Sequence, residues 1–321
     1  MFNRMTRVAY LACAISLLLA GCESSNNTVA PPKESGPLSW VVQAGGSDQN
    51  EALQALQFYP ATITIDAGDS ITWRYPAGEP HTVTFLGPKS APPPPTDPSV
   101  PAPAGGNTYD GSTYTSSGFL LGGQTYTLRF PKAGTYTYYC LIHGEMIAKV
   151  VVQPAGTAYP STPSDIEQQI PNAVAADLKT ASDAVAQFPY TVGGPHLAVG
   201  ISPGLGKPPL TKASVVRFLD GDKLSDTNVT VSAGTTVTWT NLDTNNPHTV
   251  TFAPAGQQLT PMSPFSPPLG GTTYDGSTLV NSGPLFAGQS FSLTLTKPGT
   301  YTYNCLFHDD TEHMTATIVV Q

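Results

Sequence analysis

The stretch Gly134-Thr-Tyr-Thr-Tyr-Tyr-Cys-Leu-Ile-His-Gly-Glu-Met146 has a second copy in the chain, which begins Gly299-Thr-Tyr-Thr-Tyr-Asn-Cys-Leu-Phe-His308. In each copy tyrosines alternate with threonines, which is the period-two pattern of a strand with one buried face. Each strand leads into a Cys, a His three residues later and then a Met, at Met146 and at Met314. The sequence therefore contains two copies of one strand-and-loop unit.

The repetition extends well beyond these loops. Thr108-Tyr-Asp-Gly-Ser-Thr113 recurs as Thr273-Tyr-Asp-Gly-Ser-Thr278, at the same offset of 165 residues that separates the two loop copies. Farther upstream, Pro80-His-Thr-Val-Thr-Phe85 recurs as Pro247-His-Thr-Val-Thr-Phe252. Matches in the same order across residues 80–146 and again across residues 247–314 indicate a gene duplication.

Alternating apolar residues flank the loop units in both repeats. The patterns that fit strands are Ile63 with Ile65, Ile71 with Trp73, Val229 with Val231, Val237 with Trp239, Tyr126–Phe130, Phe291–Leu295, Ile147–Val152 and Thr315–Val320. The 30 Gly and 32 Pro among 321 residues favour many turns. We predict an all-β protein of two tandem Greek-key β-sandwich domains, residues 38–153 and 196–321. Trp73 and Trp239 fit core positions.

Residues 154–195 between the repeats are predicted to be a linker that contains one short helix. Ser164 and Glu167 have the spacing of a capping box at the start of that helix, and the helix should end before Pro189. One apolar face is formed by Val174, Leu178, Ala181 and Val185. We interpret the helix as a packing element between domains rather than as a part of any chemical site.

The N-terminus has the pattern of a secretory signal over residues 1–21. Arg4 and Arg7 precede an apolar run, and Leu19-Ala-Gly-Cys22 ends it with small residues. This ending resembles a bacterial lipobox, which implies cleavage before Cys22 and acylation of that residue; an uncleaved membrane anchor is the alternative. Residues 22–37 then form a flexible tether. We expect a lipid-anchored protein of the cell envelope, at the outer membrane and facing the periplasm or the cell surface.

The net charge argues against nucleic acid as a partner. The chain carries −8, which becomes −10 when the two positive charges of the signal segment are removed. An acidic protein repels a phosphate backbone.

The remaining cysteines have another use than a disulfide. Cys13 is lost with the signal and Cys22 is acylated, which leaves Cys140 and Cys305. Exported proteins favour disulfides, but these two cysteines occupy equivalent places in two repeats, where a bond between them is not expected.

Five of the six histidines fall into two clusters that contain the cysteines. Two imidazoles, a thiolate and a weak axial thioether form the ligand set of a blue-copper site, which holds both oxidation states of copper. The predicted ligands are His81, Cys140, His143 and Met146 for one copper ion, and His248, Cys305, His308 and Met314 for a second. In the second loop five residues separate His308 from Met314, and His313 could compete for the axial place. His196 lies outside both clusters and is interpreted as a surface residue.

With these residues both repeats resemble cupredoxins of the plastocyanin, amicyanin and azurin kind. The resemblance covers nearly all of residues 38–153 and 196–321, and the first loop is similar to the short ligand loop of amicyanin. It implies an electron-transfer protein with two mononuclear type 1 copper sites. Thr82 and Thr249, which follow the first His of each site, depart from the Asn that is frequent in plastocyanin-like proteins. By this resemblance we expect redox proteins such as c-type cytochromes as partners, recruited through an apolar patch around exposed His143 or His308.

Three other interpretations remain open. Buried Cys, Met and His can be ordinary core residues.

Two-domain cupredoxin chains also resemble nitrite reductases and small multicopper oxidases. Those enzymes need His-x-His pairs and a relay His directly before the copper-binding Cys. This sequence has no His-x-His pair, and Tyr139 and Asn304 stand at the relay positions. A copper store or delivery protein would need Met-rich or Cys-rich patches, and only Met262 lies outside the two sites after signal removal. We therefore predict a carrier rather than an enzyme.

Overall fold

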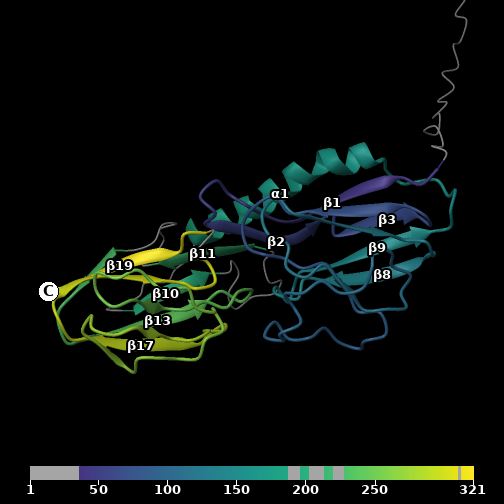
Figure 1. The fold of residues 1–321 in the computed structure, drawn as a ribbon. Coiled ribbons are helices and arrows are strands. Elements are labelled where there is room, and N and C mark those ends of the chain that lie inside the picture. Colours follow the sequence, from purple (N-terminus) through teal and green to yellow (C-terminus); the bar gives the residue numbers. More distant parts are fainter. Residues whose placement is uncertain (1–35, 187–195, 202–212, 220–227, 310–311) are drawn as a thin grey trace, which may run out of the picture. The chain divides into compact units, whose positions relative to one another are not determined.

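Strands dominate the computed structural model of this chain, in agreement with the all-β prediction (Figure 1). The structure describes residues 36–186, 196–201, 213–219, 228–309 and 312–321. The predicted signal segment, the acylated Cys22 and all but the last two residues of the tether lie outside these ranges, so they stay predictions. Within the described ranges, none of the helical structure is both long and apolar enough to cross a membrane.

The first repeat, residues 38–153, forms two layers of strands. Its strands are β1 (Ser39–Ser47), β2 (Leu53–Tyr59), β3 (Thr62–Asp66), β4 (Ser70–Arg74), β5 (Thr84–Phe85), β6 (Thr115–Ser116), β7 (Thr125–Arg129), β8 (Gly134–Tyr139) and β9 (Ile147–Gln153). One layer is a five-stranded sheet in the order β3-β9-β8-β5-β6, and the other contains β2-β1-β4-β7. β8 and β9 pair along their full length, which holds the Cys-His-Met loop between them.

The second repeat, residues 196–321, copies this arrangement. Its strands are β10 (His196–Ile201), β11 (Ala213–Leu219), β12 (Asn228–Val231), β13 (Thr235–Leu242), β14 (Thr251–Phe252), β15 (Thr273–Tyr274), β16 (Val280–Asn281), β17 (Ser290–Leu295), β18 (Gly299–Asn304) and β19 (Thr315–Val320). The five-stranded layer has the order β12-β19-β18-β14-β16. Strands therefore form at all the alternating patterns that the sequence showed.

The two sandwiches share one sheet. Equivalent strands β2 and β11 pair antiparallel, with Ala55 opposite Ala213 and Leu53 opposite Val215. This pairing joins a nine-stranded sheet in the order β15-β17-β13-β10-β11-β2-β1-β4-β7. Pairing of equivalent strands in opposite directions is the arrangement of a two-fold interface, here between two halves of one chain. Residues 35–321 group as one unit, so the predicted domain boundaries remain predictions.

Helix α1 (Pro163–Ala186) begins two residues earlier than predicted and, with 24 residues, is longer than the short helix that the sequence suggested. Thr162 and Asp165 form the capping box: the Asp165 amide donates to Thr162 Oγ1 at 3.2 Å, and the Thr162 amide donates to Asp165 Oδ2 at 2.9 Å. The predicted pair is used otherwise, because Ser164 Oγ accepts from Gln168 and Glu167 forms an ion pair with Arg74. The prediction of Ser164 and Glu167 as the capping box was therefore wrong.

The helix packs against strands of both repeats. Ile170 joins a buried cluster with Ala55 and Tyr59 of β2. Ala181 belongs to a second cluster that also contains Ala213 and Leu219 of β11. Val174, Leu178 and Ala181 of the predicted apolar face therefore cover the place where β2 meets β11, and the helix is a packing element. The side chain of Val185, the fourth member of that face, lies outside the part of the chain that the structure describes.

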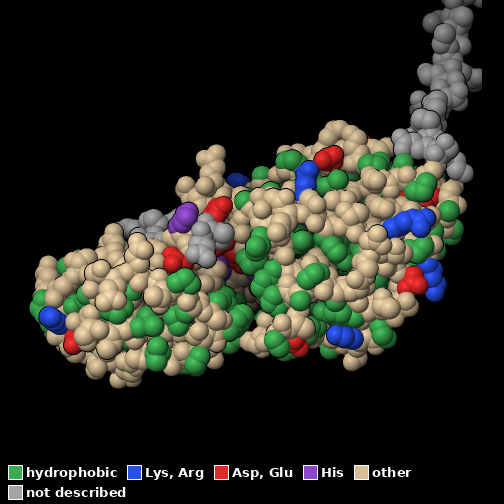
Figure 2. Space-filling model, in the orientation of Figure 1, with side chains coloured by type: hydrophobic (Ala, Val, Ile, Leu, Met, Phe, Trp, Pro, Cys, Tyr) green, Lys and Arg blue, Asp and Glu red, His purple; other side chains and the backbone are tan. Residues whose placement is uncertain are grey.

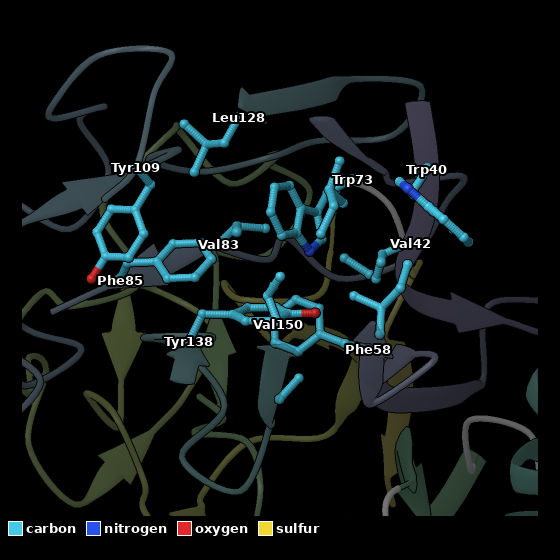
Figure 3. Packing of buried hydrophobic residues seen from close by; sticks show 14 of the residues in the cluster. Trp40, Val42, Phe58, Trp73, Val83, Phe85, Tyr109, Leu128, Tyr138 and Val150 are labelled. Atoms are coloured by element: carbon cyan, nitrogen blue, oxygen red, sulfur yellow. The ribbon is translucent and has the colours of Figure 1, made fainter. Parts of the chain in front are cut away.

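Each sandwich has an aromatic core at its centre. Trp73 contacts Phe85 and Tyr138 in the first repeat, with ring centroids 5.9 and 5.4 Å apart (Figure 3). Trp239 lies 5.5 Å from Tyr303 in the second repeat. Both tryptophans are fully buried, as predicted. These cores hold the two layers of each sandwich, and hence the loops at their ends, in a defined relation.

We predict that Ile170→Ala lowers the free energy of unfolding by about 2–5 kcal/mol, because it leaves a cavity between α1 and β2. Chemical denaturation followed by tryptophan fluorescence measures the change. Gln169→Ala is the control, since Gln169 is the exposed neighbour on the same helix. Equal stability of the two variants would contradict the packing role of α1.

Candidate metal centres

His81, Cys140 and His143 converge at one end of the first sandwich. Cys140 Sγ lies 3.7 Å from His81 Nδ1 and 3.4 Å from His143 Nδ1, and the two nitrogens are 3.0 Å apart. All three side chains are buried. His81 comes from the segment before β5, whereas the other two residues come from the loop between β8 and β9, so the sandwich brings together residues 59 positions apart.

The donor atoms fit a three-coordinate copper plane. Bonds of about 2.0 Å to each imidazole nitrogen and about 2.3 Å to a thiolate place the donors of a trigonal plane about 3.5 to 3.7 Å from one another. The observed triangle is close to this size, with the two nitrogens slightly nearer. Two imidazoles with one thiolate are also the donor types that such a site requires.

The second repeat forms the same group with His248, Cys305 and His308. Cys305 Sγ lies 3.6 Å from His248 Nδ1 and 3.3 Å from His308 Nδ1. These side chains are buried as well. In the described residues, groups of three or more possible metal-binding side chains occur at these two places.

The methionines occupy equivalent places beside the cysteines. The Cys140 amide donates to the Met146 carbonyl at 2.9 Å, and the Cys305 amide donates to the Met314 carbonyl at 3.1 Å. Both methionine side chains are buried in the core of their repeat. His313 is exposed and has a positive φ of 54°. The longer second loop thus keeps the backbone hydrogen bond from the Cys305 amide to the Met314 carbonyl and leaves His313 exposed. That either methionine is an axial copper ligand stays a prediction.

A glycine in a β-bulge supports the first histidine of each site. Gly45 and Gly200 both have a φ of +66° and lie where the register of β1 and β10 shifts. A Cβ atom at Gly45 would lie 2.0 Å from Nε2 of His81, and one at Gly200 would lie 2.2 Å from Nε2 of His248. The backbone therefore packs against the back of each ring, and Nδ1 faces the sulfur. The role of these two glycines was not predicted from the sequence.

Threonines connect the two segments that supply each site. The Thr82 amide donates to Cys140 Sγ at 3.4 Å, and the Thr82 hydroxyl accepts from the Leu141 amide at 2.7 Å. Thr249 makes the equivalent bonds, to Cys305 Sγ at 3.3 Å and from the Leu306 amide at 2.8 Å. The departure from Asn thus retains a hydrogen-bonded link between the histidine segment and the cysteine loop.

Both thiols are polarised toward the thiolate that copper requires. Burial alone would raise the pKa of Cys305, but the charge of His308 and hydrogen bonds from both histidines lower it to about 5. The pKa of Cys140 is also lowered, against the effect of burial, by His143 and His81. Burial alone would lower the pKa of His143, but Cys140 and Glu79 raise it to about 10. Copper binding at Nδ1 would therefore release a proton from this imidazole.

Glu79 lies behind the second histidine of both sites. His143 Nε2 is 2.8 Å from Glu79 Oε2, and His308 Nε2 is 3.6 Å from Glu79 Oε1. Asn246 Nδ2 donates to the same Oε1 at 3.0 Å. Burial alone would raise the pKa of Glu79, but His308 and His143 lower it, so the group is a carboxylate.

The expected exposure of His143 and His308 was wrong. Their exposed fractions are 2% and 3%, because their outer nitrogens face Glu79 instead of solvent. The expectation came from the arrangement of a single sandwich, in which no second repeat covers this edge. His196, by contrast, is exposed at the start of β10, as predicted.

Comparison with known proteins agrees with this geometry. The sequence model of copper-binding proteins of the plastocyanin/azurin family matches residues 46–153 and again residues 223–321. The chain belongs to this family. Each matched region contains one His-Cys-His group, so the two groups fit two copper ions in a tandem cupredoxin.

Individual plastocyanins are similar to about a third of the chain. Chloroplastic plastocyanin of Tetradesmus obliquus is 38% identical over 101 residues, which are 31% of this chain and 60% of that protein. Plastocyanin A'/A'' of Nicotiana tabacum is 32% identical over 110 residues, 33% of this chain and 94% of that protein. The crystal structure of amicyanin from Paracoccus versutus is 21% identical, covering 36% of this chain and 81% of that one with a TM-score of 0.24.

We predict that Gly45→Ala removes copper from the first site, because the new methyl group would displace His81. The thiolate-to-copper absorbance per chain should then fall by about half. Gly123→Ala is the matched control: Gly123 also has a positive φ, of 80°, but nothing lies within 4 Å of an added Cβ atom. This control should lose about 1–2 kcal/mol of stability and keep both sites. Full copper absorbance in Gly45→Ala would contradict the support that we assign to Gly45.

Proposed function

We propose that this cupredoxin is an electron carrier with two mononuclear type 1 copper sites, which shuttles electrons between redox proteins of the cell envelope. The observation that supports it is the pair of buried His-Cys-His groups, whose donors are held in place by the protein. Copper bound there would alternate between Cu(I) and Cu(II), which thiolate and imidazole ligands both accommodate.

Rigid ligands favour a carrier. The first histidine of each site is backed by a glycine in a bulge, the sulfur accepts from a threonine amide, and the second histidine faces Glu79. Side chains locked in this way need little rearrangement when the metal changes its charge. Small rearrangement makes electron transfer fast.

The sequence around the sites supports a carrier over an oxidase or a reductase. Tyr139 and Asn304 precede the cysteines where those enzymes have a relay histidine. Asn304 is engaged in hydrogen bonds to Asp309 and Thr315. The His-x-His pairs of a second type of copper centre do not occur in the sequence.

The surface charge and the N-terminal sequence indicate which partners the protein could have. Figure 2 shows charged side chains scattered over the visible face, without a basic patch for nucleic acid. We propose a redox protein of the c-type cytochrome class as partner, and a lipid anchor at Cys22 that keeps the carrier in the envelope. Because His143 and His308 are buried, the partner has to approach by another surface than their imidazole edges.

We predict two copper ions per chain in the protein from Glu23 onward, with thiolate-to-copper bands that bleach reversibly on reduction. Met146→Leu and Met314→Leu should each alter the visible and paramagnetic-resonance spectrum of one site, because a weak axial thioether tunes it. Turnover of oxygen or nitrite would favour an enzyme. Copper that stays Cu(I) and does not reoxidise would favour storage. A spectrum that is insensitive to Met314→Leu would remove Met314 from the second site.

A further inference from the structure

A single buried carboxylate contacts both sites. Glu79 belongs to the first repeat, yet its two oxygens face histidines of different sites: Oε2 faces His143 at 2.8 Å and Oε1 faces His308 at 3.6 Å. The exposed fraction of Glu79 is 2%. A buried charge is tolerated only with partners, so the position of this side chain depends on both halves of the chain.

The chemistry of the histidines gives Glu79 a defined role. In each site Nδ1 faces the cysteine sulfur, so Nε2 carries a proton and points at the carboxylate. A carboxylate behind a metal-binding histidine fixes the ring and makes it a more basic ligand, and loss of such a partner changes metal affinity by about 10–100-fold. Here one carboxylate acts on two metal sites.

The duplication explains how one residue came to serve two sites. Glu79 and Asn246 stand at equivalent positions, each directly before a Pro-His pair. Across the interface formed by β2 and β11 these two residues meet, and Asn246 Nδ2 donates to Glu79 Oε1 at 3.0 Å. Two glutamates there would place two buried negative charges together. With Glu at one position and Asn at the other, the two side chains form a hydrogen bond where two glutamates would repel each other, and one carboxylate faces both histidines.

We propose that Glu79 is a positioning residue shared by the two copper sites, so that the electronic state of each site depends on a side chain that the other also contacts. This inference rests on the proposed function, because it concerns the redox properties of copper bound at both groups. It makes the chain one coupled two-electron unit instead of two independent carriers. Coupling of this kind is reciprocal, so a change of state at either copper site alters the properties of the other.

The test measures the reduction potential of each site by itself. Cys305→Ser leaves the first site and Cys140→Ser leaves the second, and each protein is titrated with and without Glu79→Gln. Gln keeps the size of the side chain but removes the negative charge of Glu79. That charge stabilises Cu(II) over Cu(I), so its removal destabilises Cu(II). We expect the potential to rise in both backgrounds, by at least a tenfold change in the Cu(I)/Cu(II) equilibrium, which is about 59 mV for one electron.

Two further variants keep the test decisive. Glu145→Gln also removes a charge beside the first ligand loop, but Glu145 is exposed, so screening by water and salt should limit its effect to less than about threefold. Asn246→Leu removes a donor to Glu79 from the second repeat, which strengthens the pull of the carboxylate on His143. In the Cys305→Ser background it should lower the potential of the first site.

The outcomes separate the inference from the proposed function. If Glu79→Gln shifts the first site alone, or if Asn246→Leu leaves the first site unchanged, the shared role is wrong while the carrier stands. If the single-site proteins show no thiolate-to-copper band at all, the proposed function fails first. If Glu145→Gln shifts the reduction potential as much as Glu79→Gln does, the shift reflects only the overall charge of the protein, and the inference is overturned.

Discussion

The burial of a cysteine sulfur among fixed hydrogen-bond donors is the constraint on which each half of this protein depends. A thiolate removed from water is costly unless charged or donating groups surround it. Cys140 finds these groups in the Thr82 amide and in the two imidazoles of His81 and His143. Because those partners come from different strands and loops, the sandwich has to fold to assemble them. The pattern of strands, glycine bulges and threonine links follows from that requirement.

Duplication repeats this arrangement and adds an interface that a single sandwich lacks. Equivalent strands β2 and β11 pair across a local two-fold axis, and α1 covers the join. The same axis brings the second histidine of each site toward Glu79. Two sites that would face solvent in separate domains therefore face a common buried carboxylate. In our proposal the interface contributes to the redox chemistry of the chain as well as to its stability.

The ligand groups were predictable from sequence because their signal is local. A Cys and a His three residues apart between two alternating strands appear twice, and the duplication supplies the matching early histidine. The pairing of β2 with β11 was not predictable, since its pairs, Ala55–Ala213, Gln54–Ser214 and Leu53–Val215, are of residue types found in any strand. The exposure assigned to His143 was wrong because it was carried over from single-domain relatives. A signal for Glu79 was present in retrospect: Glu79 and Asn246 differ in charge at equivalent places beside a metal-binding histidine.

Capping illustrates a second limit. Ser164 with Glu167 and Thr162 with Asp165 both satisfy the capping-box spacing, and the sequence alone does not rank them. Tertiary contacts determine which pair caps the helix: Glu167 accepts a hydrogen bond from Arg74 of β4, and Asp165 accepts one from the Thr162 amide. Similar competition explains why Met314 and His313 could not be separated beforehand. In the folded chain Met314 is buried and His313 is exposed, and the axial role of Met314 stays a prediction.

The central claim is that each His-Cys-His group holds one copper ion. Anomalous diffraction at the copper absorption edge, from crystals of the copper-loaded chain, tests it most directly. We predict two copper peaks per chain, one bonded to Nδ1 of His81 and His143 with Cys140 Sγ, and one to the equivalent atoms of the second repeat. A single peak, or copper bound away from the two cysteines, would contradict it.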